Sequence, residues 1–181
     1  GLDLARACGV EDRRAALFAG AAVNASEDRA VLHPALRAAP DQAFQAKGEP
    51  VSAEVAQVRA AIAAFARQVR SGELRGASGK AFCNIVHIGI GGSDLGPRLV
   101  WDALRPLDSA FTLRFAANVD GSDIAAALHG LDPAETLVTV VSKTFTTQET
   151  MANAVAAREW LRRALGPDGD GHLLAVSANP K

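Results

Sequence analysis

Residues 84–97 read NIVHIGIGGSDLGP, and this stretch decides the fold prediction. Its first half is apolar and β-branched, as in a strand that is buried on both faces. Closely spaced glycines follow, and they allow the backbone to turn sharply and to approach other groups. Ser93 or Asp94 is suited to cap a helix predicted over 96–104, and Pro97 suits the first turn of that helix. A strand, a glycine turn and a helix start together predict an anion site, because backbone N–H groups and the helix dipole converge there.

Two common phosphate-binding motifs do not fit this stretch. The dinucleotide fingerprint G-x-G-x-x-G, started at Gly89, requires a glycine where the chain has Asp94. The nucleotide P-loop, started at Gly91, reaches Gly96 but continues with Pro97 where that motif needs lysine. A tight strand–helix turn that holds no ligand therefore stays an alternative.

Strand and helix patterns alternate after residue 80. Strands are predicted over 83–88, 111–115, 136–141 and 172–176, and helices over 96–104, 122–128 and 147–165. This alternation predicts an α/β fold, with a parallel sheet and flanking helices in a Rossmann-like, three-layer arrangement. Ligands of such sheets bind beyond the carboxyl ends of the strands, where loops 89–94, 118–122 and 142–147 are expected.

The chain before residue 80 carries helical patterns and few strand signals. We therefore expect a helical N-terminal segment over 1–80 and a partial α/β domain over 81–181. The clearest helix covers about 53–70, with Ser52 as N-cap and Gly72 as its stop. Since the chain ends just after its fourth predicted strand, we expect it to be a piece of a longer protein.

Composition excludes several classes of function. The 181 residues are 49% hydrophobic and 22% charged, with a net charge of −1, which gives no electrostatic case for binding nucleic acid or an anionic membrane. No apolar run approaches the ~20 residues of a membrane span. Cys8 and Cys83 match no metal spacing and are expected to be reduced thiols of a cytoplasmic protein. The four histidines show no triad or metal spacing, and His87 is expected to be a core residue of its strand.

A second stretch, residues 142–150, reads SKTFTTQET and follows a predicted buried strand. Its hydroxyls, its lysine ammonium and its backbone amides can all donate to phosphate oxygens. Thr146 and Glu149 also fit a capping box that opens the next helix, so a purely structural role stays open for these two residues. From the residues alone, the sequence predicts an α/β module that binds a small phosphorylated ligand between two strand-end loops.

The order of motifs resembles the glucose-6-phosphate isomerase (phosphoglucose isomerase) family. Residues 88–97 resemble its glycine-rich signature, residues 142–150 match its phosphate-loop motif, and residues 24–37 resemble its N-terminal block. The resemblance implies a sugar isomerase (SIS) fold and a sugar-phosphate ligand, glucose 6-phosphate or fructose 6-phosphate. It implies that the 6-phosphate is held by Gly92, Ser93, Ser142, Lys143, Thr144 and Thr147.

The chemistry implied by the resemblance is an aldose–ketose isomerisation through a cis-enediol, without a metal or other cofactor. The family's catalytic groups lie in later motifs that this chain does not contain, so no catalytic residue is assigned here and the chain alone is expected to be inactive. The family's histidine comes from a partner subunit, which implies a homodimer of the full-length protein.

Other hypotheses remain at this point. A non-catalytic SIS module, such as a sugar-phosphate sensor, would share the fold and the hydroxyl-rich loop, but it would not be expected to match residues 24–37. An interaction or structural fragment with empty loops would not respond to sugar phosphate at all. A nicotinamide oxidoreductase is disfavoured by Asp94 and by the lack of an acidic residue at the end of the second predicted strand, where residues 115–118 read FAAN.

Overall fold

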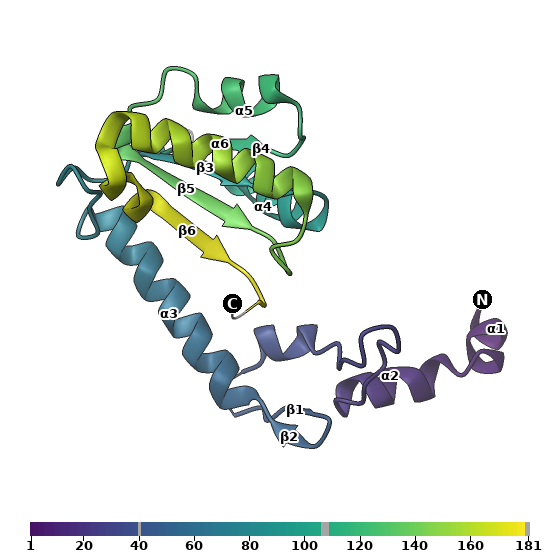
Figure 1. Ribbon diagram of the computed structural model, residues 1–181. Helices are drawn as coiled ribbons and strands as arrows, with labels where there is room; N and C mark the ends of the chain where they lie inside the picture. The colour runs from purple at the N-terminus through teal and green to yellow at the C-terminus, as the bar shows by residue number, and fades with distance from the viewer. Residues whose placement is uncertain (40, 106–108, 180–181) are drawn as a thin grey trace. The chain divides into compact units, whose positions relative to one another are not determined.

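The computed structural model describes residues 1–39, 41–105 and 109–179 of the chain. The chain divides into two compact units, Gly1–Ala66 and Arg67–Lys181. The second unit holds the sheet and the loops singled out in the sequence (Figure 1).

The first unit contains helices and one small hairpin that the sequence signals did not reveal. Its elements are α1 (Leu2–Ala7), α2 (Val10–Phe18), the 3-10 helix η1 (His33–Arg37), β1 (Gln45–Ala46), β2 (Glu49–Pro50) and most of α3 (Ser52–Ser71). Strands β1 and β2 pair antiparallel. Lys47 and Gly48 between them both have positive φ, 53° and 88°, which is the backbone of a type I′ hairpin turn. The strands are two residues each, too short for an alternating pattern to show.

Helix α3 ends as predicted and begins differently. It stops at Ser71, and Gly72 follows with φ +71°, a conformation that glycine adopts without strain. The prediction that Ser52 is the N-cap is wrong, because Ser52 is the first helical residue. Its hydroxyl accepts a hydrogen bond from the backbone N–H of Phe44 at 2.8 Å instead.

The second unit is built on a four-stranded parallel sheet, which confirms the predicted fold class. Its strands are β3 (Asn84–Ile88), β4 (Thr112–Ala116), β5 (Thr136–Val141) and β6 (Leu173–Val176), in the spatial order β4-β3-β5-β6. Each begins and ends within one residue of its prediction. Runs of β-branched and other apolar residues reveal strands that are buried on both faces, and here β3 and β5 are the two inner strands.

Helices cover both faces of this sheet. Helices α5 (Gly121–Leu128) and α6 (Gln148–Leu165) lie on one face, and α4 (Gly92–Leu104) lies on the other (Figure 1). This is the arrangement that right-handed crossovers impose when the chain moves from β3 out to β4 and then back past β3 to β5. The hydrophobic core fills the space between the sheet and α5 and α6, and its buried members are Val86, Ile88, Ala116, Ile124, Ala127, Leu128, Val138, Val140, Ala157 and Leu161.

Helix α4 starts four residues earlier than predicted. Its N-cap residue is Gly91, no side chain caps it, and Pro97 is its sixth residue instead of part of its first turn. The predicted caps are both engaged inside the helix. Asp94 is buried and its carboxylate accepts hydrogen bonds from Arg98 Nε at 3.1 Å and from an Arg98 terminal nitrogen at 2.9 Å. The backbone carbonyl of Ser93 accepts from the ring of His87.

Candidate functional site

The loops singled out in the sequence leave the same edge of the sheet. Strands β3 and β5 are parallel neighbours, and Ile88 at the end of β3 lies opposite Val140 near the end of β5. On its other side Ile88 lies opposite Ala116, the last residue of β4. The glycine turn after β3, the loop after β4 and the hydroxyl-rich loop after β5 therefore begin side by side. The structure thus brings the two predicted groups of phosphate donors to one edge.

The glycine turn excludes side chains at two positions: at Gly89 there is no space for a Cβ atom, and at Gly91 the backbone conformation would be strained for any residue with a Cβ. A Cβ atom added to Gly89 would lie 2.7 Å from the carbonyl oxygen of Ser93. Gly91 has φ +57° and ψ −122°, outside the conformations that residues with a Cβ normally adopt. Because of this turn, Gly92 and Ser93 become the first two residues of α4, where backbone N–H groups lack partners within the helix. Gly92 is exposed and Ser93 is half-buried.

The loop after β5 is organised by Ser142. Its side chain is buried, and its hydroxyl accepts from the backbone N–H of Phe145 at 3.1 Å and donates to Thr147 Oγ1 at 3.5 Å. Phe145 takes a positive φ of 55°, and its side chain packs against the core. Thr147 is the N-cap residue of α6, but its side chain makes no capping hydrogen bond. Two predicted donors, Ser142 and Thr147, are thus in contact at the N-terminus of a second helix.

Lys143 and Thr144 are exposed at the tip of this loop. The carbonyl of Lys143 accepts from the backbone N–H of Ala178 and from Ser177 Oγ, both at 3.1 Å. The carbonyl of Thr144 accepts from Asn179 Nδ2 at 2.9 Å. The chain that follows β6 therefore holds the backbone of the tip, while the side chains of Lys143 and Thr144 face away from the core.

The capping box predicted from Thr146 and Glu149 does not form. Helix α6 begins at Gln148, so Thr146 precedes the N-cap residue, and its hydroxyl lies 2.6 Å from that of Thr144. Without a side-chain cap, the first N–H groups of α6 have no partner within the helix.

The loop after β4 uses its donors internally and differs from the other two. Asp120 caps α5 by accepting from the N–H of Ser122 at 2.8 Å, and this bond lowers the pKa of the Asp120 carboxyl. Asp123 accepts from the backbone N–H groups of Ala117 and Asn118, at 2.9 and 3.0 Å. These backbone N–H groups are already hydrogen-bonded, and the carboxylates of Asp120 and Asp123 would repel an anion at this loop.

One polar residue that ties the site together escaped the sequence analysis. Asn153 is 3% exposed, lies on α6 and donates from Nδ2 to the carbonyl of Asn118 at 2.7 Å. It thereby joins α6 to the loop after β4. The available signal was a polar residue on the otherwise apolar face of the helix predicted over 147–165.

The buried carboxylate of the glycine turn is engaged in an ion pair. Asp94 is held by Arg98, and this ion pair raises the pKa of the Arg98 guanidinium. Within residues 1–39, 41–105 and 109–179, no group of three or more His, Cys, Asp or Glu side chains could hold a metal ion. In the same residues, no helix has the length and apolar character needed to cross a membrane.

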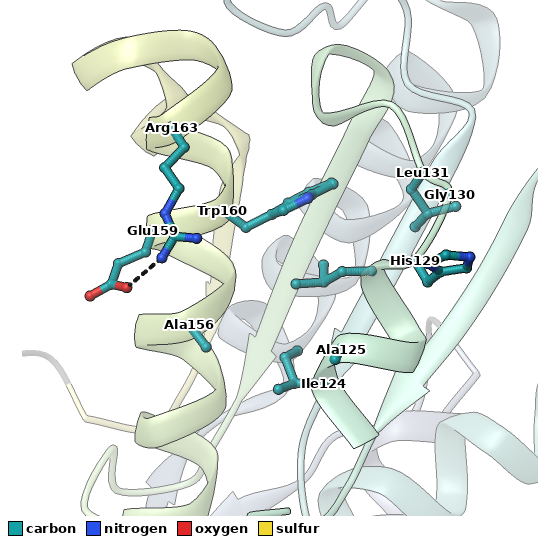
Figure 2. Close-up of a pocket in the computed structure, with 10 residues that line it drawn as sticks. Ile124, Ala125, His129, Gly130, Leu131, Ala156, Glu159, Trp160 and Arg163 are labelled. Atoms are coloured by element: carbon teal, nitrogen blue, oxygen red, sulfur yellow. Dashed lines mark hydrogen bonds and ion pairs between the residues drawn. The ribbon is translucent and has the colours of Figure 1, made fainter. Parts of the chain in front are cut away.

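A groove of about 450 Å³ lies elsewhere in this unit, between α5 and α6 (Figure 2). Its lining is Ile124, Ala125, Leu128, His129, Gly130, Leu131, Ala156, Glu159, Trp160 and Arg163. Figure 2 shows Trp160 reaching from α6 toward α5, and Arg163 paired with Glu159. None of the predicted phosphate donors lines this groove, and its wall is largely apolar.

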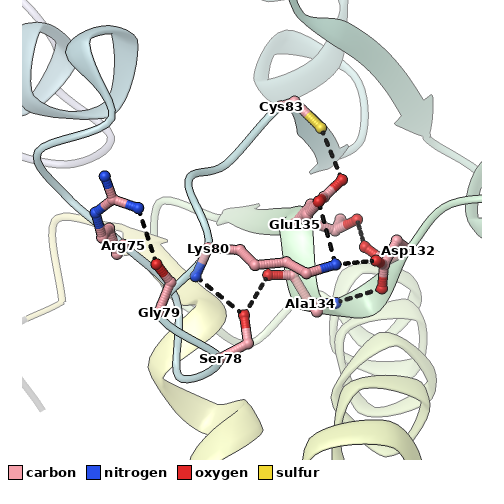
Figure 3. Close-up of polar contacts among 9 residues, drawn as sticks. Arg75, Ser78, Gly79, Lys80, Cys83, Asp132, Ala134 and Glu135 are labelled. Carbon is pink, nitrogen blue, oxygen red and sulfur yellow. Dashed lines mark hydrogen bonds and ion pairs between the residues drawn. The ribbon is translucent and has the colours of Figure 1, made fainter.

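A second polar cluster occupies the opposite, amino-terminal edge of the sheet (Figure 3). Lys80 pairs with Asp132 at 2.9 Å and with Glu135 at 3.2 Å, and these contacts raise the pKa of Lys80. Cys83 donates from Sγ to Glu135 at 3.4 Å. Burial, followed by this carboxylate, raises the pKa of the Cys83 thiol, which disfavours the reactive thiolate. The cluster ties the chain before β3 to the chain before β5, and it is structural.

Comparison with known proteins assigns the whole chain to one family. A family model described as phosphoglucose isomerase matches residues 2–181. The glucose-6-phosphate isomerase of Caulobacter sp. (strain K31) is 62% identical over 177 residues, which cover 97% of this chain and 33% of that protein. The glucose-6-phosphate isomerase of Mycolicibacterium smegmatis is 52% identical over 182 residues, covering 99% and 33%.

A solved structure agrees with the fold. The crystal structure of a glucose-6-phosphate isomerase from Chlamydia trachomatis superposes with a TM-score of 0.83 at 29% identity, over 98% of this chain and 34% of that one. The chain therefore spans about a third of the length of these relatives.

Proposed function

This chain belongs to the phosphoglucose isomerase family, and from that premise we propose that it forms the phosphate-binding part of an enzyme that interconverts glucose 6-phosphate and fructose 6-phosphate. The reaction opens the sugar ring and transfers a proton between C2 and C1 through a cis-enediol. The phosphate takes no part in these bond changes. Its binding energy instead orients the sugar for chemistry at the far end of the molecule.

Two helix N-termini on neighbouring crossovers carry this proposal. Gly92 and Ser93 open α4, while Ser142, Lys143, Thr144 and Thr147 precede α6, and both helices follow adjacent parallel strands. A phosphate dianion between them would receive backbone N–H groups, hydroxyls and one ammonium, which are the donors that phosphate sites use. Neither helix N-terminus has a side-chain cap. The N–H of Ser93 donates to the carbonyl of Ile90 at 3.1 Å, so on this proposal α4 offers the ligand the N–H of Gly92 and the Ser93 hydroxyl, and α6 offers the N–H groups of its first turn.

The catalytic base and acid belong, on this proposal, to the part of the enzyme beyond this chain. Glu149 stands in the first turn of α6 and belongs to the proposed phosphate loop, so we do not assign it as the base. The 181 residues are then expected to bind sugar phosphate without turning it over. Substantial aldose–ketose conversion by this chain, measured beside a full-length family enzyme, would refute that expectation.

The remaining features of the whole protein follow from the same premise. We propose a cytoplasmic homodimer with sugar phosphate as its ligand, and a division into a helical segment over 1–80 and a sugar-phosphate-binding domain from residue 81 onward.

Calorimetric titration of the chain with glucose 6-phosphate tests the binding role. Lys143→Met should weaken binding by about tenfold or more, because a hydrogen bond to a charged group contributes roughly 1.5–3 kcal/mol. Lys47→Met is the matched control: it makes the same change at an exposed lysine that pairs with Asp28 in the first unit, and it should leave the affinity within about twofold. Equal effects of the two substitutions, or no binding by the unaltered chain, would overturn the proposal.

A further inference from the structure

Helix α4 contains a proline at an interior position, where a backbone N–H would normally donate a hydrogen bond within the helix. Pro97 is its sixth residue, and the carbonyl that its N–H would meet four positions earlier is that of Ser93. Proline has no N–H, and its ring pushes against this same carbonyl. The first turn of α4 therefore loses one of the hydrogen bonds that would fix its backbone, at the point where the proposed phosphate site begins.

A histidine from the sheet supplies the missing donor. His87 lies on β3, is 8% exposed, and its Nε2 is 2.7 Å from the carbonyl oxygen of Ser93. A carbonyl only accepts, so the proton of the neutral ring is on Nε2. Nδ1 is then an acceptor, and Thr139 Oγ1 lies 3.2 Å from it, on the strand position directly opposite His87 in β5. The hydroxyl of Thr139 can donate to Nδ1, which is compatible with the tautomer that serves Ser93.

The surrounding contacts leave the ring little freedom. Its centroid is 5.4 Å from that of Phe115, and the guanidinium carbon of Arg98 lies 4.5 Å from the Phe115 centroid. Arg98 in turn holds the buried carboxylate of Asp94. Gly89 completes the arrangement, because it alone permits the Ser93 carbonyl to approach the backbone of the turn. The Ser93 carbonyl is consequently held from the sheet side by His87 of β3, and not by an N–H four residues later in its own helix.

We propose that His87 is a positioning residue of the phosphate site: it replaces the N–H that Pro97 lacks and thereby fixes the orientation of Gly92 and Ser93 at the start of α4. Its importance for ligand affinity rests on the function proposed above, whereas its coupling to Pro97 does not. A histidine that merely fills space in the core would show neither a fixed tautomer nor a dependence on Pro97.

A double-mutant cycle between positions 87 and 97 tests the coupling. His87→Leu fills the space of the ring with an apolar side chain and removes the donor, and should raise the unfolding equilibrium constant by about tenfold or more. Pro97→Ala restores an N–H facing Ser93, so in that background His87→Leu should cost at least threefold less. Effects that agree within about twofold in the two backgrounds mean additivity, and would overturn the proposal.

His87→Gln is the conservative variant, because its amide nitrogen reaches about as far as Nε2 and can donate to the same carbonyl. Its unfolding constant should stay within about threefold of the unaltered chain in either background, even if His87→Leu fails to fold. A loss as large as that of His87→Leu would contradict a donor role.

Nuclear magnetic resonance separates this proposal from the function itself. Ring ¹⁵N shifts should show the Nε2–H tautomer of His87, and the amide signals of Gly92 and Ser93 should move in His87→Leu and return in His87→Gln. The Nδ1–H tautomer, or unmoved amides, would overturn the proposal whether or not sugar phosphate binds. If the chain binds no glucose 6-phosphate while these signals behave as expected, the proposed function fails and the positioning role stands.

Discussion

Gly89→Ala should disrupt the glycine turn by placing a methyl group against the start of α4. The new Cβ would lie 2.7 Å from the carbonyl oxygen of Ser93 and 3.0 Å from both its carbonyl carbon and its Cβ. Two of these are backbone atoms at the start of a helix, which cannot rotate away, so the strand end and α4 must separate. Overpacking of this kind costs about 1–3 kcal/mol of unfolding free energy.

Gly92→Ala is the matched control for this substitution. Gly92 is the first residue of the same helix, its φ is not positive, and a Cβ there meets nothing within 4 Å. Alanine in place of glycine at a position whose backbone it can adopt stabilises a protein by about 0.4–1 kcal/mol, so Gly92→Ala should stabilise the chain. Urea unfolding should therefore show a lower unfolding free energy for the first variant and a higher one for the control, each relative to the unaltered chain. If Gly89→Ala proves as stable as the unaltered chain, the close approach of Gly89 to Ser93, and with it the account of the turn, is refuted.

Three further outcomes are expected. Arg158 and Arg162 both hold the Asp170 carboxylate and keep its pKa well below the usual range, so this contact stabilises the fold above pH ~4 and its contribution is lost as the pH falls below that. Acid titration of Asp170→Asn should therefore show a shallower loss of stability than that of the unaltered chain. Thr150 Oγ1 is buried with no partner among the described residues, so Thr150→Val should leave the melting temperature unchanged or raise it, and a marked drop would mean that the hydroxyl is in use. Ser142→Ala removes the acceptor for the Phe145 N–H, so amide hydrogen exchange at Phe145 should speed up by about fivefold or more, while unchanged protection would deny the loop geometry.

Features of the fold that depend on local chemistry were predictable from the sequence. The strands before Gly89 and Ser142 are short runs rich in β-branched residues and followed by turn residues, a pattern typical of buried strands. The end of α3 was predictable because it depends on the positive φ of Gly72, which glycine adopts without strain. The meeting of the two donor loops also followed, since adjacent parallel strands release their loops at one edge.

Features that depend on distant partners were missed. A proline six residues into a helix contradicts local rules, and it is tolerated in α4 because His87, ten residues earlier and on a strand, bonds to the Ser93 carbonyl. Ser52 resembles a cap, but the N–H of Phe44 uses its hydroxyl. Thr146 resembles part of a capping box, yet the loop places its hydroxyl against that of Thr144. In each case a tertiary contact overrides the local preference.

The candidate site divides in the same way. Its donor types and their positions after the strands followed from the sequence, whereas the contact between Ser142 and Thr147 and the bridge from Asn153 to Asn118 required the structure. Buried polar residues on helix faces, such as Asn153 and Thr150, carry no period or spacing that distinguishes a bridge from an exception.

The central claim is that one dianion is bound by donors from both crossovers at once. Titrating the isotopically labelled chain with glucose 6-phosphate, and following backbone amide signals, tests it most directly. The amides of Gly92 and Ser93 and those of residues 144–148 should shift together and saturate with a single dissociation constant. Shifts confined to one loop, two different constants, or no shift in either loop would contradict the claim.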